Sequence, residues 1–364
     1  MNVSGLFARF AVLAALAAIV GGCAGPQKMV HEQRRFFWPP LPERPRIEWV
    51  KSYYSQLDFP KTGMRQFMAG IAGDEEPISF MKPLDIKSNG KGKIYVSDAG
   101  VQGVFVYDLA KSDVHMLGKE NSSGLFKQVI GVAVDSADNV YVSDAEKNLV
   151  LAFTADEKPL RTIELGPHVL KGGGLTIDNQ RSRLYVADTK GHRIVAFGLD
   201  GKHLFSFGQR GDADASFNYP IDVDVNSKGD IIVADSMNAR VQIFDSEGKF
   251  LRKFGRRGDG LGDFQIIKAV AVDSDDNIYV TDGKGHKVEI FSAGGDYLLS
   301  VGGLYSVHAT GKEAPGGFLI PQGIDIDNND AIYVVDQLNR RFQVFQYLSD
   351  RFLKANPIPG VELK

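Results

Sequence analysis

Residues 269–302 read AVAVDSDDNIYVTDGKGHKVEIFSAGGDYLLSVG, and this stretch decides the fold that the sequence predicts. Apolar residues alternate with polar or small ones in AVAVD, NIYVTD, KVEIF and DYLLSVG. The short segments SDD, GKGH and SAGG separate these four runs. A period of two over short runs between turn residues is typical of antiparallel β-strands joined by tight turns. The stretch therefore predicts one small four-stranded sheet.

The same pattern recurs along the chain. The motif [YI]-V-x-D occurs six times, and each aspartate has a valine two residues before it and an aromatic residue nine residues after it. The aspartates are spaced 46, 44, 47, 47 and 54 residues apart. Four strands per unit at such a period are typical of β-propeller blades. We therefore expect an all-β protein with six four-stranded antiparallel blades over residues 81–348, stacked so that the valines and aromatics lie between blades. The repeat aspartates are Asp98, Asp144, Asp188, Asp235, Asp282 and Asp336.

One unit also carries a family resemblance. Residues 220–255, PIDVDVNSKGDIIVADSMNARVQIFDSEGKFLRKFG, closely resemble the consensus of the NHL repeat, which implies a six-bladed propeller. The resemblance covers about three-quarters of the chain and is clearest in the last three repeats. The first two repeats depart from it. Gly103 and Leu149 stand where the other four have a basic residue: Arg193, Arg240, Lys287 and Arg341.

The N-terminus predicts export. Residues 1–22 contain one charge, Arg9, and an uncharged run over 10–22 that is too short to span a bilayer, which needs about 20 apolar residues. The run ends in IVGGC, which resembles the lipobox of bacterial lipoproteins, so 1–22 would be cleaved and Cys23 lipidated. A plain secretory signal is the alternative. Ala24 follows the cysteine, which by the same resemblance implies the outer membrane where the host is Gram-negative. Residues 23–45 are expected to form the lipidated, proline-rich tether.

Composition excludes several classes of site. Cys23 is the only cysteine, so the expected mature fold has no disulfide, cysteine-ligated metal, iron–sulfur cluster or cysteine nucleophile. The formal net charge of −3 gives no electrostatic basis for binding nucleic acid.

A propeller ring must also close. Residues 46–57 contain the alternating run RIEWVKSYYS, which we expect to pair with the last blade and leave no open edge. The alternative is that DRFLKANP (350–357), in the tail over 349–364, completes that blade. Residues 58–80 lie outside the repeat. Within them Met64, Phe67, Met68 and Ile71 are spaced as on one face of a short helix, which would pack on the propeller, bind a partner or contact the membrane.

No catalytic constellation is recognisable. The recurring Asp-x4-Arg/Lys pattern is interpreted as structural: the aspartate ends a strand, accepts turn N–H groups and pairs with the basic residue of the next strand. The seven histidines do not converge on a common column, so neither a metal site nor a cofactor is predicted. Carboxylates lining the central channel around a calcium ion are kept as an alternative.

In a four-stranded meander, the turns between second and third strands emerge on the same side as the connections between blades. We call this side the loop face. It includes the longest insertion, 302–318, and long loops on a rigid scaffold often bind partners. We therefore predict a non-enzymatic lipoprotein that binds a cell-envelope protein or an anionic polymer; a metal-dependent hydrolase or lyase with its site in the channel is the alternative. The oligomeric state is left open. The predicted binding residues are Lys190, His192, Arg210, Asn238, Arg256, Arg257, Lys284, His286, Asn339 and Arg340.

The lipid anchor is directly testable. Replacing Cys23 by serine removes the thiol that would carry the lipid, so we expect the protein to move from the membrane fraction to the soluble fraction. Several acyl chains, each contributing about 0.8 kcal/mol per buried CH₂, hold a lipoprotein firmly on a bilayer. Fractionation and intact-mass measurement of wild type and Cys23→Ser check this. Wild type that is soluble and lacks acyl mass would support the secretory alternative.

Overall fold

The computed structural model describes residues 35–60, 77–118, 124–359 and 361. The chain divides into two units, Met1–Arg35 and Phe36–Lys364, and the description below concerns the second. Cys23 and the predicted helix around 64–71 lie outside the described residues.

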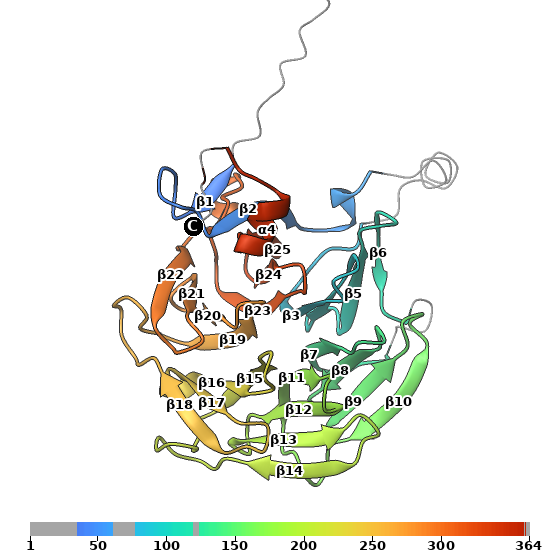
Figure 1. Cartoon of the computed structure of the whole chain (residues 1–364). Coiled ribbons are helices and arrows are strands. Elements are labelled where there is room, and N and C mark those ends of the chain that lie inside the picture. Colours follow the sequence, from blue (N-terminus) through green and yellow to red (C-terminus); the bar gives the residue numbers. More distant parts are fainter. Residues whose placement is uncertain (1–34, 61–76, 119–123, 360, 362–364) are drawn as a thin grey trace, which may run out of the picture. The chain divides into compact units, whose positions relative to one another are not determined.

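Six antiparallel sheets form the ring, and the first strand of each lies nearest its centre (Figure 1). The all-β, six-bladed prediction is confirmed. The first blade contains β3 (Pro83–Ser88), β4 (Lys93–Asp98), β5 (Gly103–Asp108) and β6 (Asp113–Met116), and the second contains β7 (Val129–Val134), β8 (Val140–Asp144), β9 (Leu149–Phe153) and β10 (Pro159–Glu164). The third contains β11 (Gly172–Asp178), β12 (Arg183–Asp188), β13 (Arg193–Gly198) and β14 (His203–Phe207), and the fourth contains β15 (Pro220–Val225), β16 (Ile231–Asp235), β17 (Arg240–Phe244) and β18 (Phe250–Phe254). The fifth contains β19 (Ile267–Val272), β20 (Ile278–Asp282), β21 (Lys287–Phe291) and β22 (Tyr297–Gly302), and the sixth contains β23 (Pro321–Ile326), β24 (Ala331–Asp336) and β25 (Arg341–Tyr347) with strands from the N-terminal side.

The last blade closes the ring with strands from both ends of the second unit. β2 (Ile47–Tyr53) pairs antiparallel with β25, with Trp49 opposite Phe345, and β1 (Phe36–Trp38) adds a fifth strand outside it. Residues 350–357 do not complete the blade, because α4 (Asp350–Ala355) begins there behind a Ser349 cap. Drawing the closing strand from the other end of the fold joins first and last blades without leaving β25 as an open edge.

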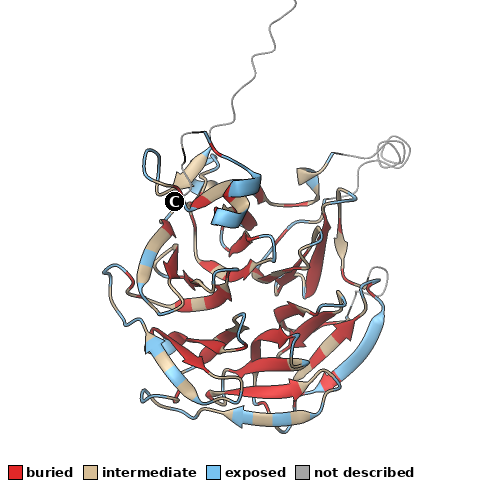
Figure 2. Ribbon diagram, in the orientation of Figure 1, coloured by how far each residue is buried: buried red, intermediate tan, exposed pale blue. Residues whose placement is uncertain are grey.

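The core lies between neighbouring blades rather than in one central mass. Buried residues accordingly recur in the strands of every blade (Figure 2). All six repeat valines are at most 1% exposed, and the repeat aromatics at most 2%. Aromatic rings pack against one another across the junctions. The ring centroids of Phe207 (β14) and Phe244 (β17) are 4.8 Å apart, and those of Phe254 (β18) and Phe291 (β21) are 4.5 Å apart. The outer strands β14 and β18 alternate between exposed and half-buried positions, as expected for one solvated face.

Two glycines begin similar loops between blades, GQRGDADASF (208–217) and GRRGDGLGDF (255–264). Gly208 and Gly255 directly follow the outer strands β14 and β18 and have φ of 95° and 86°, in the region that favours glycine. A Cβ at either position would lie 2.4 Å from the ring of Phe217 or Phe264, which is fully buried beneath the loop. The glycine thus lets each loop fold its phenylalanine back into the junction.

Arg341 links the last blade to the closing strand and gives a stability test. Its side chain is fully buried, and it donates to Asp336 (2.8 Å), to Gly317 O (2.6 Å) and to the Tyr54 hydroxyl (3.0 Å). Replacing it by methionine leaves Asp336 buried without its cation, so we expect a loss of about 3–5 kcal/mol. Urea unfolding measures this. Arg193→Met is the comparison variant, because Arg193 makes the equivalent bond to the equally buried Asp188 but its own side chain is 32% exposed. Water can reach the place that Arg193 vacates, so the expected loss is smaller than for Arg341→Met. Equal losses would contradict the assigned role in closure.

Candidate functional site

The six repeat aspartates are fully buried at the ends of the second strands, where their carboxylates gather N–H donors. Asp188 accepts backbone N–H bonds from Lys171 (3.0 Å), just before β11, and from Gly191 (3.0 Å), in the turn after β12. Each of the other five also accepts one N–H from the start of its blade and one from that turn, from backbone or from an asparagine side chain. These carboxylates therefore hold together two segments of the loop face.

The expected pairing with the next strand's basic residue holds for the arginines. Arg240 donates to Asp235 at 2.8 Å, and Arg193 and Arg341 make the equivalent bond. Lys287 departs from the expectation, because its ammonium pairs with Glu289. Glu289 lies two residues further along the same strand, so both side chains point to the same face of the sheet.

Four of the ten predicted binding residues are used by the fold. Nδ1 of His192 accepts the backbone N–H of Tyr219, and Nδ1 of His286 accepts that of Ile320, both at 3.2 Å. Asn339 is buried and holds the insertion that contains α3 (Val307–Thr310), accepting from Val307 N at 2.8 Å. The side-chain amide of Asn238, in the short helix η3 (Ser236–Asn238), donates to Gly211 O at 2.9 Å, across the neighbouring connection.

The other six predicted residues are exposed cations. Arg256 forms an ion pair with Asp263 at 2.8 Å, and Arg257 donates to two backbone carbonyls. The remaining four are Lys190, Arg210, Lys284 and Arg340, and within the described ranges none of their side chains has a hydrogen-bond or ion-pair partner.

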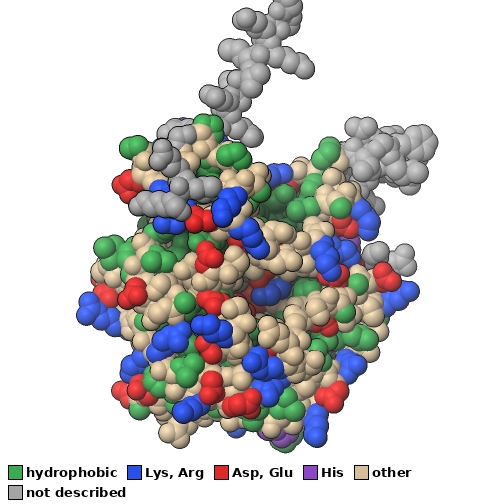
Figure 3. All heavy atoms as spheres, in the orientation of Figure 1, with side chains coloured by type: hydrophobic (Ala, Val, Ile, Leu, Met, Phe, Trp, Pro, Cys, Tyr) green, Lys and Arg blue, Asp and Glu red, His purple; other side chains and the backbone are tan. Residues whose placement is uncertain are grey.

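A cavity of about 500 Å³ opens at the opposite end of the strands. Its lining comes from the first strands and from the turns that follow them, and all six blades contribute. We call it the channel mouth. The molecule is visibly hollowed near the centre of the face in Figure 3, with basic and acidic atoms inside the hollow.

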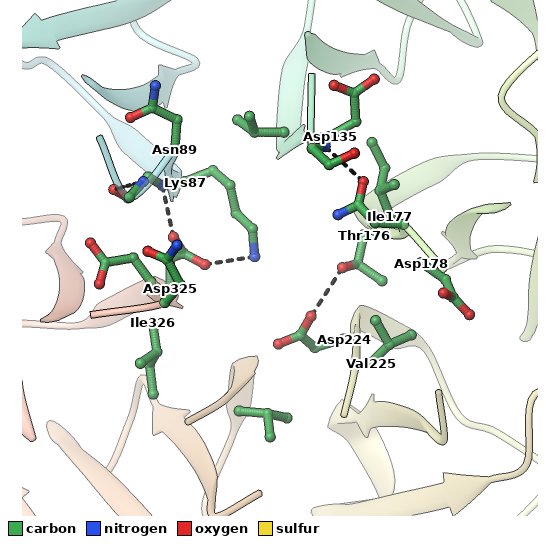
Figure 4. Close-up of a pocket in the computed structure, with 18 of the residues that line it drawn as sticks. Lys87, Asn89, Asp135, Thr176, Ile177, Asp178, Asp224, Val225, Asp325 and Ile326 are labelled. Carbon is green, nitrogen blue, oxygen red and sulfur yellow. Dashed lines mark hydrogen bonds and ion pairs between the residues drawn. The ribbon is translucent and has the colours of Figure 1, made fainter. Parts of the chain in front are cut away.

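Ion pairs and hydrogen bonds between blades cross the inner end of the channel mouth (Figure 4). Lys87 of β3 reaches Asp325 of β23 with an Nζ–Oδ1 distance of 2.6 Å, and Asp325 also accepts the backbone N–H of Ser88. Opposite them, the Thr176 hydroxyl of β11 donates to Asp224 of β15 at 3.0 Å.

A second pair of channel carboxyl groups lies two residues earlier in the first strands, closer to the loop face. Asp85 of β3 accepts the N–H of Val132 in the next blade (2.8 Å), and Asp222 of β15 accepts that of Val270 (3.0 Å). Each carboxylate lies over a glycine of the preceding blade: a Cβ at Gly323 or at Gly174 would come within 2.5 Å or 2.1 Å of an aspartate oxygen. The two aspartates thus occupy equivalent places three blades apart.

The carboxyl groups of the channel bind their protons more tightly than free carboxyl groups do. Burial, with the nearby Asp325 charge, raises the pKa of Asp85 to about 6, and burial with the Asp85 charge raises the pKa of Asp222 well above its usual value. Burial also raises the pKa of Asp224, although Lys87 offsets part of the effect. Burial alone would lower the pKa of Lys87, but the surrounding carboxylates outweigh it and raise that pKa. The Lys87 ammonium therefore interacts electrostatically with several carboxyl groups, those of Asp325, Asp224 and Asp85.

Sequence reasoning missed this cluster, although the repeat contained a signal for it. Lys87, Asp224 and Asp325 each stand eleven residues before a repeat aspartate, and Asp85 and Asp222 stand thirteen before one. First strands line a propeller's channel. The positions eleven and thirteen residues before each repeat aspartate could therefore have been recognised by comparing the six repeats with one another.

Over the described ranges, no group of three or more His, Cys, Asp or Glu side chains is arranged to hold a metal ion. Within the same ranges, no helix is long and apolar enough to cross a bilayer.

Comparisons with known proteins agree on the fold. A family model described as a 6-bladed beta-propeller matches residues 214–301. No curated protein matches the chain significantly. A Bacteroides thetaiotaomicron protein of unknown function is 16% identical with a TM-score of 0.59, covering 73% of this chain and 70% of its own. An auxiliary nutrient binding protein from the same organism is 15% identical with a TM-score of 0.56, covering 74% and 70%. A streptogramin B lyase is 11% identical with a TM-score of 0.55, covering 74% and 95%. At these identities the likeness is one of fold.

The raised pKa of Asp85 predicts a pH effect on stability. Because folding raises this pKa from 3.8 to about 6, the native state binds the proton more tightly than the unfolded chain does. The associated stability is fully present below about pH 4 and is lost as the pH rises through about 6. Asp85→Asn keeps an acceptor for Val132 N without the buried charge. We expect this substitution to raise the free energy of unfolding at pH 7 by about 2 kcal/mol. Between pH 4 and 7 the free energy of unfolding, measured with urea, should then decrease less than it does in wild type. Asp212→Asn, at an exposed aspartate, should change neither; an Asp85→Asn curve parallel to wild type would contradict the assignment.

Proposed function

We propose that this protein is a lipid-anchored, non-enzymatic binding protein of the cell envelope, exported and held through Cys23, whose loop face binds an acidic protein or an anionic polymer. The observation that carries the proposal is the set of exposed cations on that face. An auxiliary nutrient binding protein among the similar folds supports binding as a role for such a scaffold.

The loop-face cations are available because the fold does not use them. Lys190, Arg210, Lys284 and Arg340 project from turns and connections of the third to sixth blades. Two acids of the connections between these blades are paired, Asp214 with Lys253 and Asp263 with Arg256. Asp212 and Asp259 are exposed and have no ion-pair partner among the described residues, but the six exposed cations of the predicted set outnumber these acids although the whole chain is negative.

The spacing of these cations favours an extended partner. They arise from separate blades, each fixed by a buried repeat aspartate and the hydrogen bonds around it, so they present a rigid array rather than one pocket. Exposed charges of this kind mainly accelerate association and select partners of opposite sign, with an effect that weakens as salt rises. An acidic protein surface or an anionic polymer fits such an array.

The alternative, a metal-dependent hydrolase or lyase, would use the channel carboxylates. A divalent cation that raises the melting temperature of the purified protein would favour it, since a ligand that binds only the native state stabilises that state.

Charge reversal tests the proposed face. The variant Arg210→Glu, Arg256→Glu, Lys284→Glu replaces three exposed cations, so we expect a partner that co-purifies with the native lipoprotein from solubilised membranes to be lost. Mass spectrometry of the bound fraction identifies it, and the wild-type complex should weaken as salt rises. The control carries Lys158→Glu, Lys202→Glu and Lys228→Glu, the same charge change at exposed turns on the opposite side of the ring.

The control separates a local effect from a change in net charge. A partner lost from the loop-face variant and kept by the control supports the proposal. A partner kept by both variants, or lost equally from both, would place the interface elsewhere or make it non-specific, and either result would overturn the loop-face assignment.

A further inference from the structure

The channel mouth lies on the side of the ring away from the loop face, so an inference about it is independent of the proposal above. Its volume, about 500 Å³, is in the range of pockets that bind small molecules, about 300–1,000 Å³. Polar groups lie at its inner end, and aliphatic side chains stand around it, including Ile177, Val225 and Ile326 (Figure 4).

The charges in the cavity are unbalanced. Lys87 is the cation at its inner end, and it is held by Asp325 at 2.6 Å. One carboxylate oxygen of Asp224 accepts the hydrogen bond from the Thr176 hydroxyl. Among the described residues no cation lies within ion-pair distance of the Asp224 carboxylate. Two carboxylates, Asp224 and Asp325, thus face one ammonium at the inner end of the cavity. This arrangement favours a further positive charge over an anion.

Lys87 shows which cation the cavity accommodates. Its side chain is a primary ammonium on a four-carbon aliphatic chain, and it already rests among these carboxylates with 22% of its surface exposed. The ammonium hydrogen-bonds to a carboxylate while methylene groups need only apolar neighbours. Asp224 with the aliphatic side chains around it offers a second place of the same chemistry, open to solvent through the mouth.

We propose that the channel mouth binds a small organic cation, a primary ammonium on a short aliphatic chain, with Asp224 as the carboxylate that receives the ammonium. Ile177, Val225 and Ile326 contact the methylene chain. Lys87 and Asp325 close the inner end of the site.

A matched series of small probes tests the charge requirement. Butylamine and putrescine carry the ammonium, whereas butanol and butyrate have the same chain with a neutral or negative group. We expect the two amines to raise the melting temperature saturably at constant ionic strength and butanol and butyrate not to do so. Equal stabilisation by butanol, no stabilisation by either amine, or a larger and saturable shift with calcium would each overturn the proposal.

Two variants with opposite expected effects locate the site. Asp224→Asn keeps the size and the acceptor for Thr176 but removes the charge, so amine binding should weaken by about tenfold or more. Lys87→Met vacates the built-in ammonium and leaves more carboxylate unpaired, so amine binding should tighten, and butylamine should recover part of the lost melting temperature. Asp212→Asn, the same substitution on the loop face, should bind as wild type.

The pair keeps the test decisive if one variant folds poorly. Each variant is first required to melt cooperatively. Unchanged amine affinity in a folded Asp224→Asn protein, or weaker affinity in a folded Lys87→Met protein, would remove the site from the channel mouth.

Discussion

The buried aspartate at the end of each second strand is the interaction on which the rest of the structure depends. A carboxylate removed from water is costly unless donors surround it, so the segment before the first strand and the turn after the second must both supply N–H groups. Asp188, with Lys171 on one side and Gly191 on the other, shows the arrangement. Repeating it six times fixes one end of every blade, and it turns the loops of that end into a rigid surface on which exposed side chains keep their places.

Ring closure gives the other end of the molecule its chemistry. Because six first strands must meet around one axis, residues of all six line the channel mouth. Positions between blades keep valines and aromatics, since every junction needs the same packing. The channel positions are free of that requirement, and here they vary: Asp85 lies over Gly323, Asp222 lies over Gly174, and Lys87 stands where another blade has Asp224. A repeated scaffold thus contains an asymmetric polar centre.

The fold could be read from the sequence because its determinants recur. A motif present six times with its valine and aromatic columns specifies the blade, and RIEWVKSYYS supplies the strand that pairs with β25. The site is harder to predict, since a period of two shows that a strand alternates but not which side meets the channel. His192 and Asn339 were predicted from their place in turns, whereas their role depends on hydrogen bonds to distant backbone groups, Tyr219 N and Val307 N. Lys87 and Asp325 come from opposite ends of the repeat array, and only ring closure brings them together.

The two faces have opposite electrostatic preferences, and the fold keeps them apart. Strands of five or six residues separate them, a length of about 17–20 Å, beyond the screening length at physiological salt. Bonds between blades, such as that from Thr176 to Asp224, tie the first strands to their neighbours, so neither face needs the other to move in order to be formed. Sites this far apart without shared partners contribute additively. An anionic partner on the loop face and a cation in the channel mouth would therefore bind without competing, and the presence of one says nothing about the presence of the other.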